Sequence, residues 1–391
     1  MMLSKNSNRL MGQQMFQILD EANKLKLKGK KIYHFEIGDP SYDTPKKVVD
    51  SCIKSLRDGI THYSGSGGLE KFKKAAVKRF KLSRKFEPNL NQILVTQGAN
   101  VQIFYSLYCI ADAGDEILIS DPSFVSYLSI IKMLNLKPIF YNLSEKNNFQ
   151  VNLSELKDKI SKKTKAIIIN SPNNPTGSLL TKENITNIFK IAKKNKIFLI
   201  SDEVYGRLVY EKSRFFSPSV LDKCKTTTIV VHSLSKSYAM TGWRIGAITA
   251  PSKLVEKMQL LLETTTSCVS PFIQIAAIKA LNSSQLEIKN IVEDLKEKRD
   301  LIFKLISKIE NISCLKPNGA FYIFVNIKKL AIDDVKFSKK LLKKRGVATC
   351  PGSFFGRNGR GYIRFSFATS SNTIKLGIAE LKKFILLKEY L

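Results

Sequence analysis

Lys236 is placed unlike the other lysines of this lysine-rich chain. It lies in SLSKSYAMTGWRIG, residues 233–246, directly after an apolar run that predicts a buried strand. Ser233 and Ser235 flank it, and the next charged residue is Arg244. Two hydroxyl groups and a guanidinium are typical ligands of a phosphate. A desolvated lysine near other cations has a lowered pKa, and its neutral amine can form a Schiff base with an aldehyde. The stretch therefore indicates a site for an aldehyde that carries a phosphate.

Two earlier strand ends carry weaker signals of the same kind. TQGAN (96–100) begins an apolar helix, and a glycine followed by small residues leaves backbone N–H groups free to bind an anion. An ordinary helix N-terminus accounts for this segment equally well. In SDPSFVSY (120–127), Phe124 either packs in the core or stacks on a planar ligand. Neither segment identifies a site by itself.

Two later strand ends are more informative. In SPNNPTG (171–177), two prolines and a glycine form a tight turn that holds Asn174 with its amide free to hydrogen-bond. ISDEVYGRL (200–208) ends an apolar strand with Asp202, a carboxylate whose burial is costly without a partner. A protonated ring nitrogen would be a suitable partner, and a solvated turn is the plain alternative. Tyr205 lies on the same side as Asp202 if the chain turns helically there.

The elements that must position these residues alternate along the chain. Short apolar runs alternate with longer helical stretches, which predicts an α/β fold whose large domain has a mainly parallel, seven-stranded sheet between helices. The expected strands cover residues 92–95, 116–120, 137–141, 165–170, 197–201, 228–233 and 244–249. Ligands of such folds collect at the carboxyl ends of the strands, where the polar motifs lie.

A second, smaller α+β domain is expected from the C-terminal part of the chain. A long charged helix is expected at 285–309, strands at 318–327 and 361–369, and a helix at 335–346. The predicted divisions are residues 1–47, an N-terminal segment joining the small domain; 48–285, the large cofactor-binding domain; and 286–391, the small domain. Both chain ends thus contribute to the smaller domain.

The composition is that of an ordinary globular protein. The 391 residues are 43% hydrophobic and 25% charged, enough for a large core with a second domain. No apolar run reaches the roughly 18 residues of a membrane span, and the first residues show no signal-peptide core. The six cysteines are scattered without CxxC spacing, as in a reduced cytosolic protein. We therefore expect a cytoplasmic protein with no membrane partner.

The net charge of +31 has two interpretations. Binding to nucleic acid or to an anionic membrane surface is one, because basic surfaces attract phosphates. A lysine-heavy composition without a functional partner is the other. The charges are spread over many helices, and no zinc knuckle or RNP-like motif accompanies them. We therefore predict no nucleic-acid partner.

A phosphate, an aldehyde, a ring nitrogen that needs a carboxylate and an aromatic plate together describe pyridoxal 5′-phosphate. From HFEIGDPSYDTP (34–45) to YIRFSFATS (362–370), the chain resembles the class I/II aminotransferases, the fold type I pyridoxal-phosphate enzymes of aspartate-aminotransferase type. The motifs that carry the resemblance are, in order, HYSGSGGLEKFK, TQGAN, SPNNPTG, SDEVY, SLSKSYAMTGWRIG, NGAFYIF, PGSFFG and YIRFSFA. A single motif such as NPTG is weak, but the ordered set is specific.

The resemblance implies a role for each matching residue. Lys236 is expected to form the Schiff base and then to carry the proton between substrate and cofactor. Asp202 is expected to keep the pyridine nitrogen protonated, which makes the ring an electron sink. Arg364 is expected to bind the substrate α-carboxylate in a bidentate pair, with Gly38 contacting the same group. The other implied contacts are Tyr205 and Asn174 at the ring oxygen (Asn174 also near the substrate), Phe124 as the stacking ring, and Gly98, Ala99, Ser233, Ser235 and Arg244 at the phosphate.

The implied reaction is transamination between an L-amino acid and a 2-oxo acid, with 2-oxoglutarate as the expected acceptor. Tyr63 resembles the tyrosine that reaches the phosphate from the neighbouring subunit, so a homodimer with shared active sites is implied. A β-lyase or synthase of the same fold stays open, because site geometry chooses the bond that is broken. The joint presence of Lys236, Asp202 and Arg364 disfavours a non-catalytic basic regulatory protein. A serine hydrolase and a Rossmann dehydrogenase are excluded by the missing GxSxG and GxGxxG motifs.

The donor amino acid is left open. In dicarboxylate-specific members, an arginine of the partner subunit binds the distal carboxylate, and the matching residues 257–271 contain no arginine. A related subgroup uses a lysine just after the glycines of the phosphate loop, where this chain has Asn100. Met15 and Phe16 either line a pocket or form a helical staple. A neutral or aromatic amino acid is therefore at least as well supported as aspartate.

Overall fold

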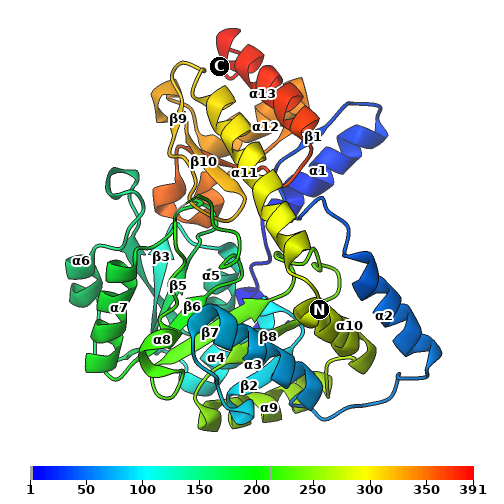
Figure 1. Ribbon diagram of the computed structural model, residues 1–391. Helices are drawn as coiled ribbons and strands as arrows, with labels where there is room; N and C mark the ends of the chain where they lie inside the picture. The colour runs from blue at the N-terminus through cyan, green and yellow to red at the C-terminus, as the bar shows by residue number, and fades with distance from the viewer. Residues whose placement is uncertain (1–2, 212) are drawn as a thin grey trace.

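The computed structural model describes residues 3–211 and 213–391. Figure 1 shows a large unit around a central sheet, coloured cyan to green, and a smaller unit above it in orange and red. Helix α11 (Leu286–Ile306) extends from the large unit into the smaller one. The two units and the long helix correspond to the architecture expected from the sequence.

Seven strands form the central sheet. In spatial order they are β2 (Ile93–Thr96), β8 (Gly246–Thr249), β7 (Thr228–Ser233), β6 (Phe198–Asp202), β5 (Thr164–Asn170), β3 (Glu116–Asp121) and β4 (Lys137–Asn142). Strands β2, β3 and β8 are buried at every residue, because helices cover both faces of the sheet. The prediction of a seven-stranded, mainly parallel sheet is confirmed.

One strand, β8, runs against the rest of the sheet. It pairs antiparallel with both β2 and β7, whereas β3, β4, β5, β6 and β7 pair parallel. Residues 234–245 contain no helix that could carry the chain back to the starting edge of the sheet. The chain therefore returns directly beside β7, as antiparallel neighbours do. Hydrophobic pattern alone does not reveal strand direction, so the sequence did not predict this reversal.

Helices cover the two faces of the sheet in separate groups. Ile200 of β6 packs with the helices of one face, and its neighbour Leu199 packs with those of the other, because consecutive strand residues point to opposite sides. The first face, called the α4 face, carries α4 (Ala99–Ile110), α5 (Val125–Met133) and α9 (Ser252–Thr266). The second face, called the α3 face, carries α3 (Glu70–Arg84), α7 (Lys182–Lys194) and α10 (Pro271–Asn282). Helices α2 (Lys46–Arg57), α6 (Leu153–Asp158) and α8 (Ser219–Asp222) complete the large unit.

The smaller unit is built on an antiparallel sheet. In spatial order its strands are β12 (Cys350–Pro351), β13 (Tyr362–Ser366), β10 (Tyr322–Asn326) and β9 (Ser313–Cys314). Helices α12 (Asp334–Arg345) and α13 (Ser371–Leu386) pack beside it, with Phe337 and Phe384 in edge-to-face contact 5.2 Å apart. This sheet places residue 364 on the side that faces the large unit.

The N-terminal segment lies against the smaller unit. Strand β1 (Tyr33–His34) pairs in parallel with β11 (Val347–Ala348), and α1 (Met15–Leu27) packs against the same region. Helix α1 and strand β1 thus pack with elements of the smaller unit. The divisions at 47/48 and 285/286 stay predictions.

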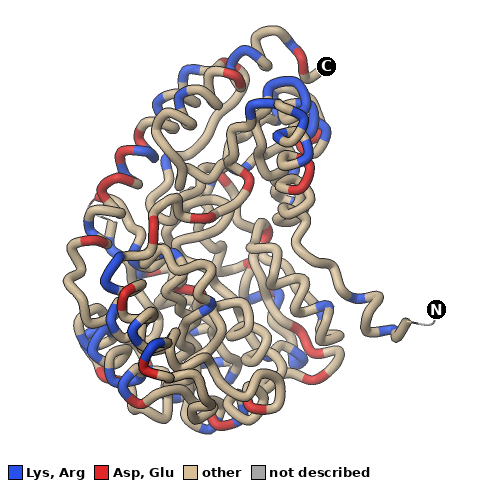
Figure 2. Tube along the Cα trace, turned by 90° about the vertical axis from the view of Figure 1, so that its right-hand side faces the viewer, with Lys and Arg blue, Asp and Glu red and all other residues tan. Residues whose placement is uncertain are grey.

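The surface is basic over both units. Figure 2 shows lysines and arginines along helices and loops of the large and the small unit rather than in one stripe. No helix in the described part of the chain is long and apolar enough to cross a membrane. All six cysteines are free, with Cys224 and Cys350 buried and the others partly buried.

Candidate active site

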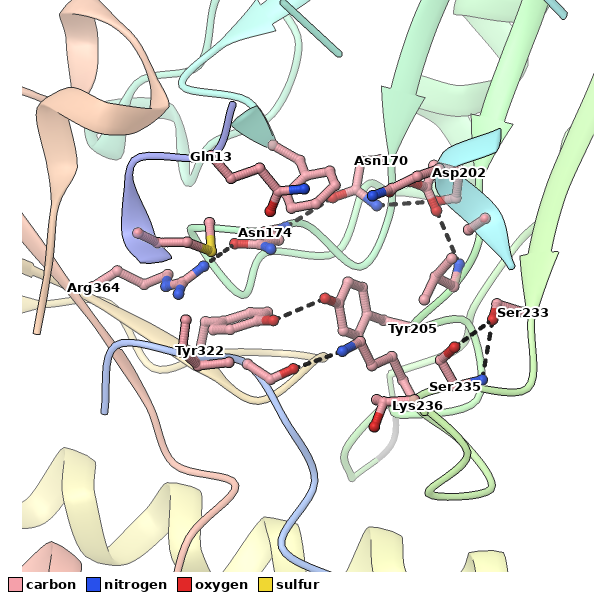
Figure 3. A pocket seen from close by; sticks show the side chains of 18 of the residues that line it. Gln13, Asn170, Asn174, Asp202, Tyr205, Ser233, Ser235, Lys236, Tyr322 and Arg364 are labelled. Carbon is pink, nitrogen blue, oxygen red and sulfur yellow. Dashed lines mark hydrogen bonds between the residues drawn. The ribbon is translucent and has the colours of Figure 1, made fainter. Parts of the chain in front are cut away.

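A cavity of about 290 Å³ opens at the carboxyl ends of the central strands, where the N-terminal segment and the smaller unit meet the sheet (Figure 3). Its wall contains most of the residues that the sequence singled out. The lining residues are Gln13, Met15, Phe16, Ile37, Gly38, Ala99, Asn100, Phe124, Asn170, Asn174, Asp202, Val204, Tyr205, Ser233, Ser235, Lys236, Thr241, Arg244, Tyr322 and Arg364.

Lys236 projects into this cavity from the turn that follows β7. Its Nζ donates a hydrogen bond of 2.6 Å to the carbonyl of Gly38 in the N-terminal segment. The pKa of Lys236 is lowered to about 8, mainly by burial; Asp39 opposes the shift, and the nearby charges of Arg244 and Arg364 add to it. A substantial fraction of this amine is therefore neutral near physiological pH, which is the form that attacks a carbonyl carbon.

Asp202 is the last residue of β6 and lies on the α4 face of the sheet. Its Oδ2 accepts a hydrogen bond of 2.5 Å from the hydroxyl of Tyr127, and its Oδ1 accepts one of 3.1 Å from the amide of Val204. Burial raises the pKa of Asp202 to about 6 in spite of these two donors. Among the described residues no cationic side chain pairs with this buried carboxylate, and a protonated nitrogen beside it would be strongly stabilised.

Two polar pairs connect the large and small units across the cavity. The hydroxyls of Tyr205 and Tyr322 lie 2.8 Å apart, and Arg364 Nη1 donates a 2.8 Å hydrogen bond to Asn174 Oδ1 (Figure 3). Burial raises the pKa of Tyr205 well above its usual value, so its hydroxyl stays a proton donor. These two hydrogen bonds join the large and the small unit on either side of the cavity.

Arg364 is fully buried at the end of the cavity formed by the smaller unit. Its Nη2 donates to the carbonyl of Glu36, and its guanidinium lies 4.5 Å from the ring centre of Tyr322. Its Nε has no hydrogen-bond partner among the described residues. A buried guanidinium without a carboxylate and with a free donor suits the binding of a small carboxylate.

The opposite end of the cavity is rich in hydrogen-bond donors. Ser233 Oγ donates to Ser235 Oγ at 2.8 Å and accepts from the Ser235 amide at 3.1 Å. Arg244 adopts a left-handed backbone conformation (φ +51°), and its Nη1 donates to the carbonyl of Thr241. Gly98 has φ +83°, and a Cβ at this position would lie 2.6 Å from Arg244 Nη2. Glycine is therefore required for the guanidinium to reach the N-terminus of α4.

Two of the sequence-predicted residues lie outside the cavity wall. Gly98 stands behind Arg244, while the next residue, Ala99, lines the cavity. Tyr63 is 86% exposed and lies in a separate surface groove of about 410 Å³ with Thr266 and Cys268. The structure therefore does not bring Tyr63 to the cavity of its own chain.

Sequence reasoning missed three polar residues of the site. Tyr127 and Tyr322 lie in apolar stretches, where a tyrosine is most often a core residue, and only the tertiary structure reveals their hydroxyl partners. Asn170 ends β5 beside Asp202, and its amide donates to the Asp202 carbonyl at 3.1 Å. The signal that identified Asp202, a polar residue closing an apolar strand, applies equally to Asn170.

The chemistry of the cavity fits pyridoxal phosphate. It combines an amine with a lowered pKa, a buried carboxylate that pairs with no cationic side chain of the described residues, an aromatic ring at Phe124 and a cradle of hydroxyl and guanidinium donors. Lys236 would meet the aldehyde, Asp202 the ring nitrogen, and Ser233, Ser235 and Arg244 the phosphate. Fold and site together define an enzyme of the pyridoxal-phosphate-dependent, fold type I class.

Comparison with known proteins gives the family. The model of "Aminotransferase class I and II" matches residues 30–381. An aspartate aminotransferase of Pyrococcus horikoshii is 34% identical, covering 94% of this chain and 93% of its own length. A (5-formylfuran-3-yl)methyl phosphate transaminase of Methanocaldococcus jannaschii is 36% identical, covering 97% and 99%. The structure of an alanine aminotransferase from Pyrococcus furiosus superposes with a TM-score of 0.93 at 31% identity, covering 99% and 100%.

The chain therefore belongs to the class I and II aminotransferase family, and it is a pyridoxal-phosphate-dependent transaminase. The resemblance inferred from the sequence is confirmed. The names of the relatives differ in their substrates, so the family does not specify the amino-group donor.

Proposed function

We propose that the protein transfers the amino group of an uncharged or aromatic L-amino acid to 2-oxoglutarate through a covalent link at Lys236. The observation that carries the proposal is the presence in one cavity of a half-buried Lys236, with a pKa of about 8, and of a buried Asp202 that pairs with no cationic side chain of the described residues. When bound, the cofactor supplies an electron sink that stabilises negative charge at the substrate Cα.

The residues of the chain supply binding and proton transfer. The Lys236 amine would hold the cofactor through its aldehyde carbon, with release of water, and, once freed by the substrate amine, would take the proton from the substrate Cα and return it on the cofactor side. Asp202 keeps the ring nitrogen protonated because the buried carboxylate is stabilised by that cation. The hydroxyl of Tyr205 and the amide of Asn174 donate to the ring oxygen and hold the ring in one orientation.

Arg364 is proposed to bind the substrate α-carboxylate. Its guanidinium has no carboxylate partner among the described residues, and its Nε is free to donate. Substrate binding would exchange the Asn174 contact for a bidentate pair, which is the strongest form of an arginine–carboxylate contact. The Gly38 backbone, which accepts from Lys236 in the present structure, lies beside the same group.

The part of the cavity wall assigned to the substrate side chain favours an uncharged amino acid as the amino-group donor. Met15, Phe16 and Ile37 supply apolar surface. Apart from Lys236, Arg244 and Arg364, no cationic side chain of the described residues lines the cavity.

Gln13 and Asn100 are the uncharged donors available to the distal carboxylate of 2-oxoglutarate. Gln13 Nε2 donates to Ser126 Oγ at 3.1 Å in the present structure. Each side-chain amide can donate a hydrogen bond to a carboxylate and accept one from a hydroxyl. Each can therefore contact 2-oxoglutarate in one half-reaction and an uncharged amino acid in the other.

We further propose a cytoplasmic homodimer. Tyr63 is exposed on a grooved surface and, by family resemblance, would complete the phosphate cradle of the partner subunit. A dimer bridged in this way would lose cofactor affinity in Tyr63→Phe without losing the fold. Lysines and arginines lie along both units in Figure 2, and the absence of a nucleic-acid partner stays a prediction.

A half-reaction screen tests the proposal. Each amino acid is added to the purified protein saturated with pyridoxal phosphate, and the loss of the visible cofactor absorbance is followed. We expect alanine-like or aromatic amino acids to react fastest and Arg364→Ala to raise the half-saturating concentration at least about 30-fold, as loss of a buried charge partner does. Fastest reaction with aspartate would refute the side-chain assignment, and no reaction with any amino acid would refute transamination.

A further inference from the structure

We propose that a second cavity, on the α3 face of the sheet, binds a small oxyanion between the guanidinium groups of Arg79 and Arg84. The cavity lies between α3 and the end of β7 and is separate from the active site. Its lining residues are Phe72, Ala76, Arg79, Phe80, Arg84, His232, Leu234, Ala247 and Leu281. None of these residues lines the active-site cavity.

The strand geometry explains why a second site can lie so close to the first. Asp202 and Ser233 belong to the active site, and their sequence neighbours Glu203 and His232 belong to the region behind it. Consecutive residues at the strand ends point to opposite faces. The two cavities therefore share a backbone but not side chains.

The α3 cavity has more positive than negative charge around it. Arg84 forms an ion pair with Glu203, whose other oxygen accepts from Ser201 and Ser217. Arg79 Nε donates to the carbonyl of Leu281 at 2.6 Å and has no carboxylate partner among the described residues. One carboxylate thus faces two lining guanidinium groups.

A third guanidinium, that of Arg207, adds to the excess. It donates to the hydroxyl of Tyr238 and to Gln285, both at 2.6 Å, and neither is an anion. Burial lowers the pKa of Arg207, and the charges of Arg79 and Arg84 act in the same direction. Like charges held together in a poorly hydrated region repel one another, and a bound anion relieves that repulsion.

Hydrogen-bond donors without a partner in this cavity indicate the kind of ligand that it binds. The Arg84 side chain is nine-tenths buried, and its Nε has no hydrogen-bond partner in the described part of the chain. Burial and the charges of Arg84 and Arg207 lower the pKa of His232 to about 3, so its ring is neutral and offers one further donor. Two guanidinium forks and a neutral imidazole match the oxygens of a phosphate or carboxylate.

The size of the cavity limits the ligand to a small group. Its volume is about 40 Å³, and its remaining wall is apolar, with Phe72, Phe80 and Leu234. That space holds a few water-sized atoms and no nucleotide or amino acid. We therefore assign a single oxyanion group, either an inorganic ion or the head of a small metabolite.

Titration of inorganic phosphate into the protein saturated with pyridoxal phosphate tests the site. Occupying the active site with cofactor first removes its phosphate cradle as a competitor, and chloride keeps the ionic strength constant. We expect saturable binding of one phosphate per chain and a raised melting temperature. Arg79→Gln should weaken binding at least tenfold, because it removes an unpaired guanidinium. Lys78→Gln, an exposed neighbour on α3, should leave binding unchanged.

A second variant distinguishes a loss of phosphate binding from a loss of folding. Ala76→Leu fills the cavity without changing its charge and should abolish the phosphate effect even if Arg79→Gln folds poorly. Sulfate and acetate identify the chemistry: an equal effect of sulfate assigns a tetrahedral oxyanion, and an equal effect of acetate assigns a carboxylate. The proposal is overturned if no oxyanion binds saturably, if Lys78→Gln weakens binding as much as Arg79→Gln, or if Arg364→Ala alone abolishes it.

Discussion

The two faces of the sheet each carry a buried carboxylate at the end of β6, and the two carboxylates differ in their partners. On the α4 face, Asp202 is a buried carboxylate whose described partners are a tyrosine hydroxyl and a backbone amide. On the α3 face, Glu203 is a buried carboxylate paired with Arg84. Asp202 thus pairs with no cationic side chain of the described residues, whereas Glu203 has a cationic partner.

The difference shows how adjacent residues can serve separate purposes. A buried carboxylate without a cation stores an electrostatic cost that a cationic ligand removes, so Asp202 favours ligand binding at the expense of the ligand-free fold. A buried ion pair such as Arg84–Glu203 instead needs both partners for the fold itself. The comparison leads to four predictions, given from the largest expected effect to the smallest.

Lys236→Ala should remove activity almost completely. The lysine provides both the covalent link and the proton transfer, so we expect kcat to fall at least about 10⁴-fold. Transaminase turnover and the visible cofactor absorbance are measured together, with Lys78→Gln as an exposed-lysine control. Retention of more than a hundredth of the activity would show that another group performs the proton transfer.

Glu203→Gln and Asp202→Asn should have opposite effects on stability. Removing Glu203 leaves the Arg84 charge buried and unpaired, which should cost about 3–5 kcal/mol of unfolding free energy. Asp202→Asn removes a buried charge that has no cation, so the cofactor-free protein should be unchanged or more stable. Urea denaturation near neutral pH measures both. Equal losses in the two variants would contradict the distinction between the faces.

The stability of the cofactor-free protein should fall as pH rises from about 4 to 6. The folded state holds the Asp202 proton up to a pKa of about 6, whereas the unfolded chain releases it near the usual aspartate pKa of 3.8. The folded state therefore binds more protons within this window, and stability decreases with rising pH by about 3 kcal/mol. Denaturation at several pH values measures the slope attributable to this residue. The slope should be smaller in Asp202→Asn, and an unchanged slope would assign the effect to other groups.

Tyr127→Phe should extend to higher pH the range over which the stability of the cofactor-free protein falls. It removes the 2.5 Å hydrogen bond that favours the ionised form of Asp202. The pKa of Asp202 should rise further, by roughly one pH unit, since such a bond contributes about 1.5 kcal/mol. The upper end of the pH-dependent window moves upward accordingly. A profile identical to the wild type would mean that the amide of Val204 alone stabilises the carboxylate.

The sequence predicted the sheet well because each buried strand is an uninterrupted apolar run followed by polar residues. The same rule predicted that Asp202, Asn174 and Lys236 meet at one edge, and all three line the cavity. Strand direction was not predictable at β8, since apolar composition is the same in either direction. Tyr127 and Tyr322 were missed because a tyrosine in an apolar stretch looks like core until its hydroxyl partner is known.

The α3 cavity was invisible in the sequence for a related reason. Arg79 and Arg84 are two of many basic residues on a charged helix, and nothing in their spacing distinguishes them from solvated neighbours such as Lys78. Only the folded structure brings Arg79 and Arg84 to line one cavity with His232. Burial of charge depends on tertiary contacts that composition does not encode.

The use of both chain ends in one cavity sets an order of events during synthesis. Apart from Tyr63, the residues assigned to the cofactor lie between residues 98 and 244, so they are synthesised before Arg364 of β13. The N-terminal residues Gln13 and Met15 are made first, yet β1 pairs with β11, which is made among the last elements. A nascent or truncated chain can thus present part of a cofactor site long before it can bind a substrate. Substrate selectivity therefore depends on elements that are synthesised after the residues assigned to the cofactor.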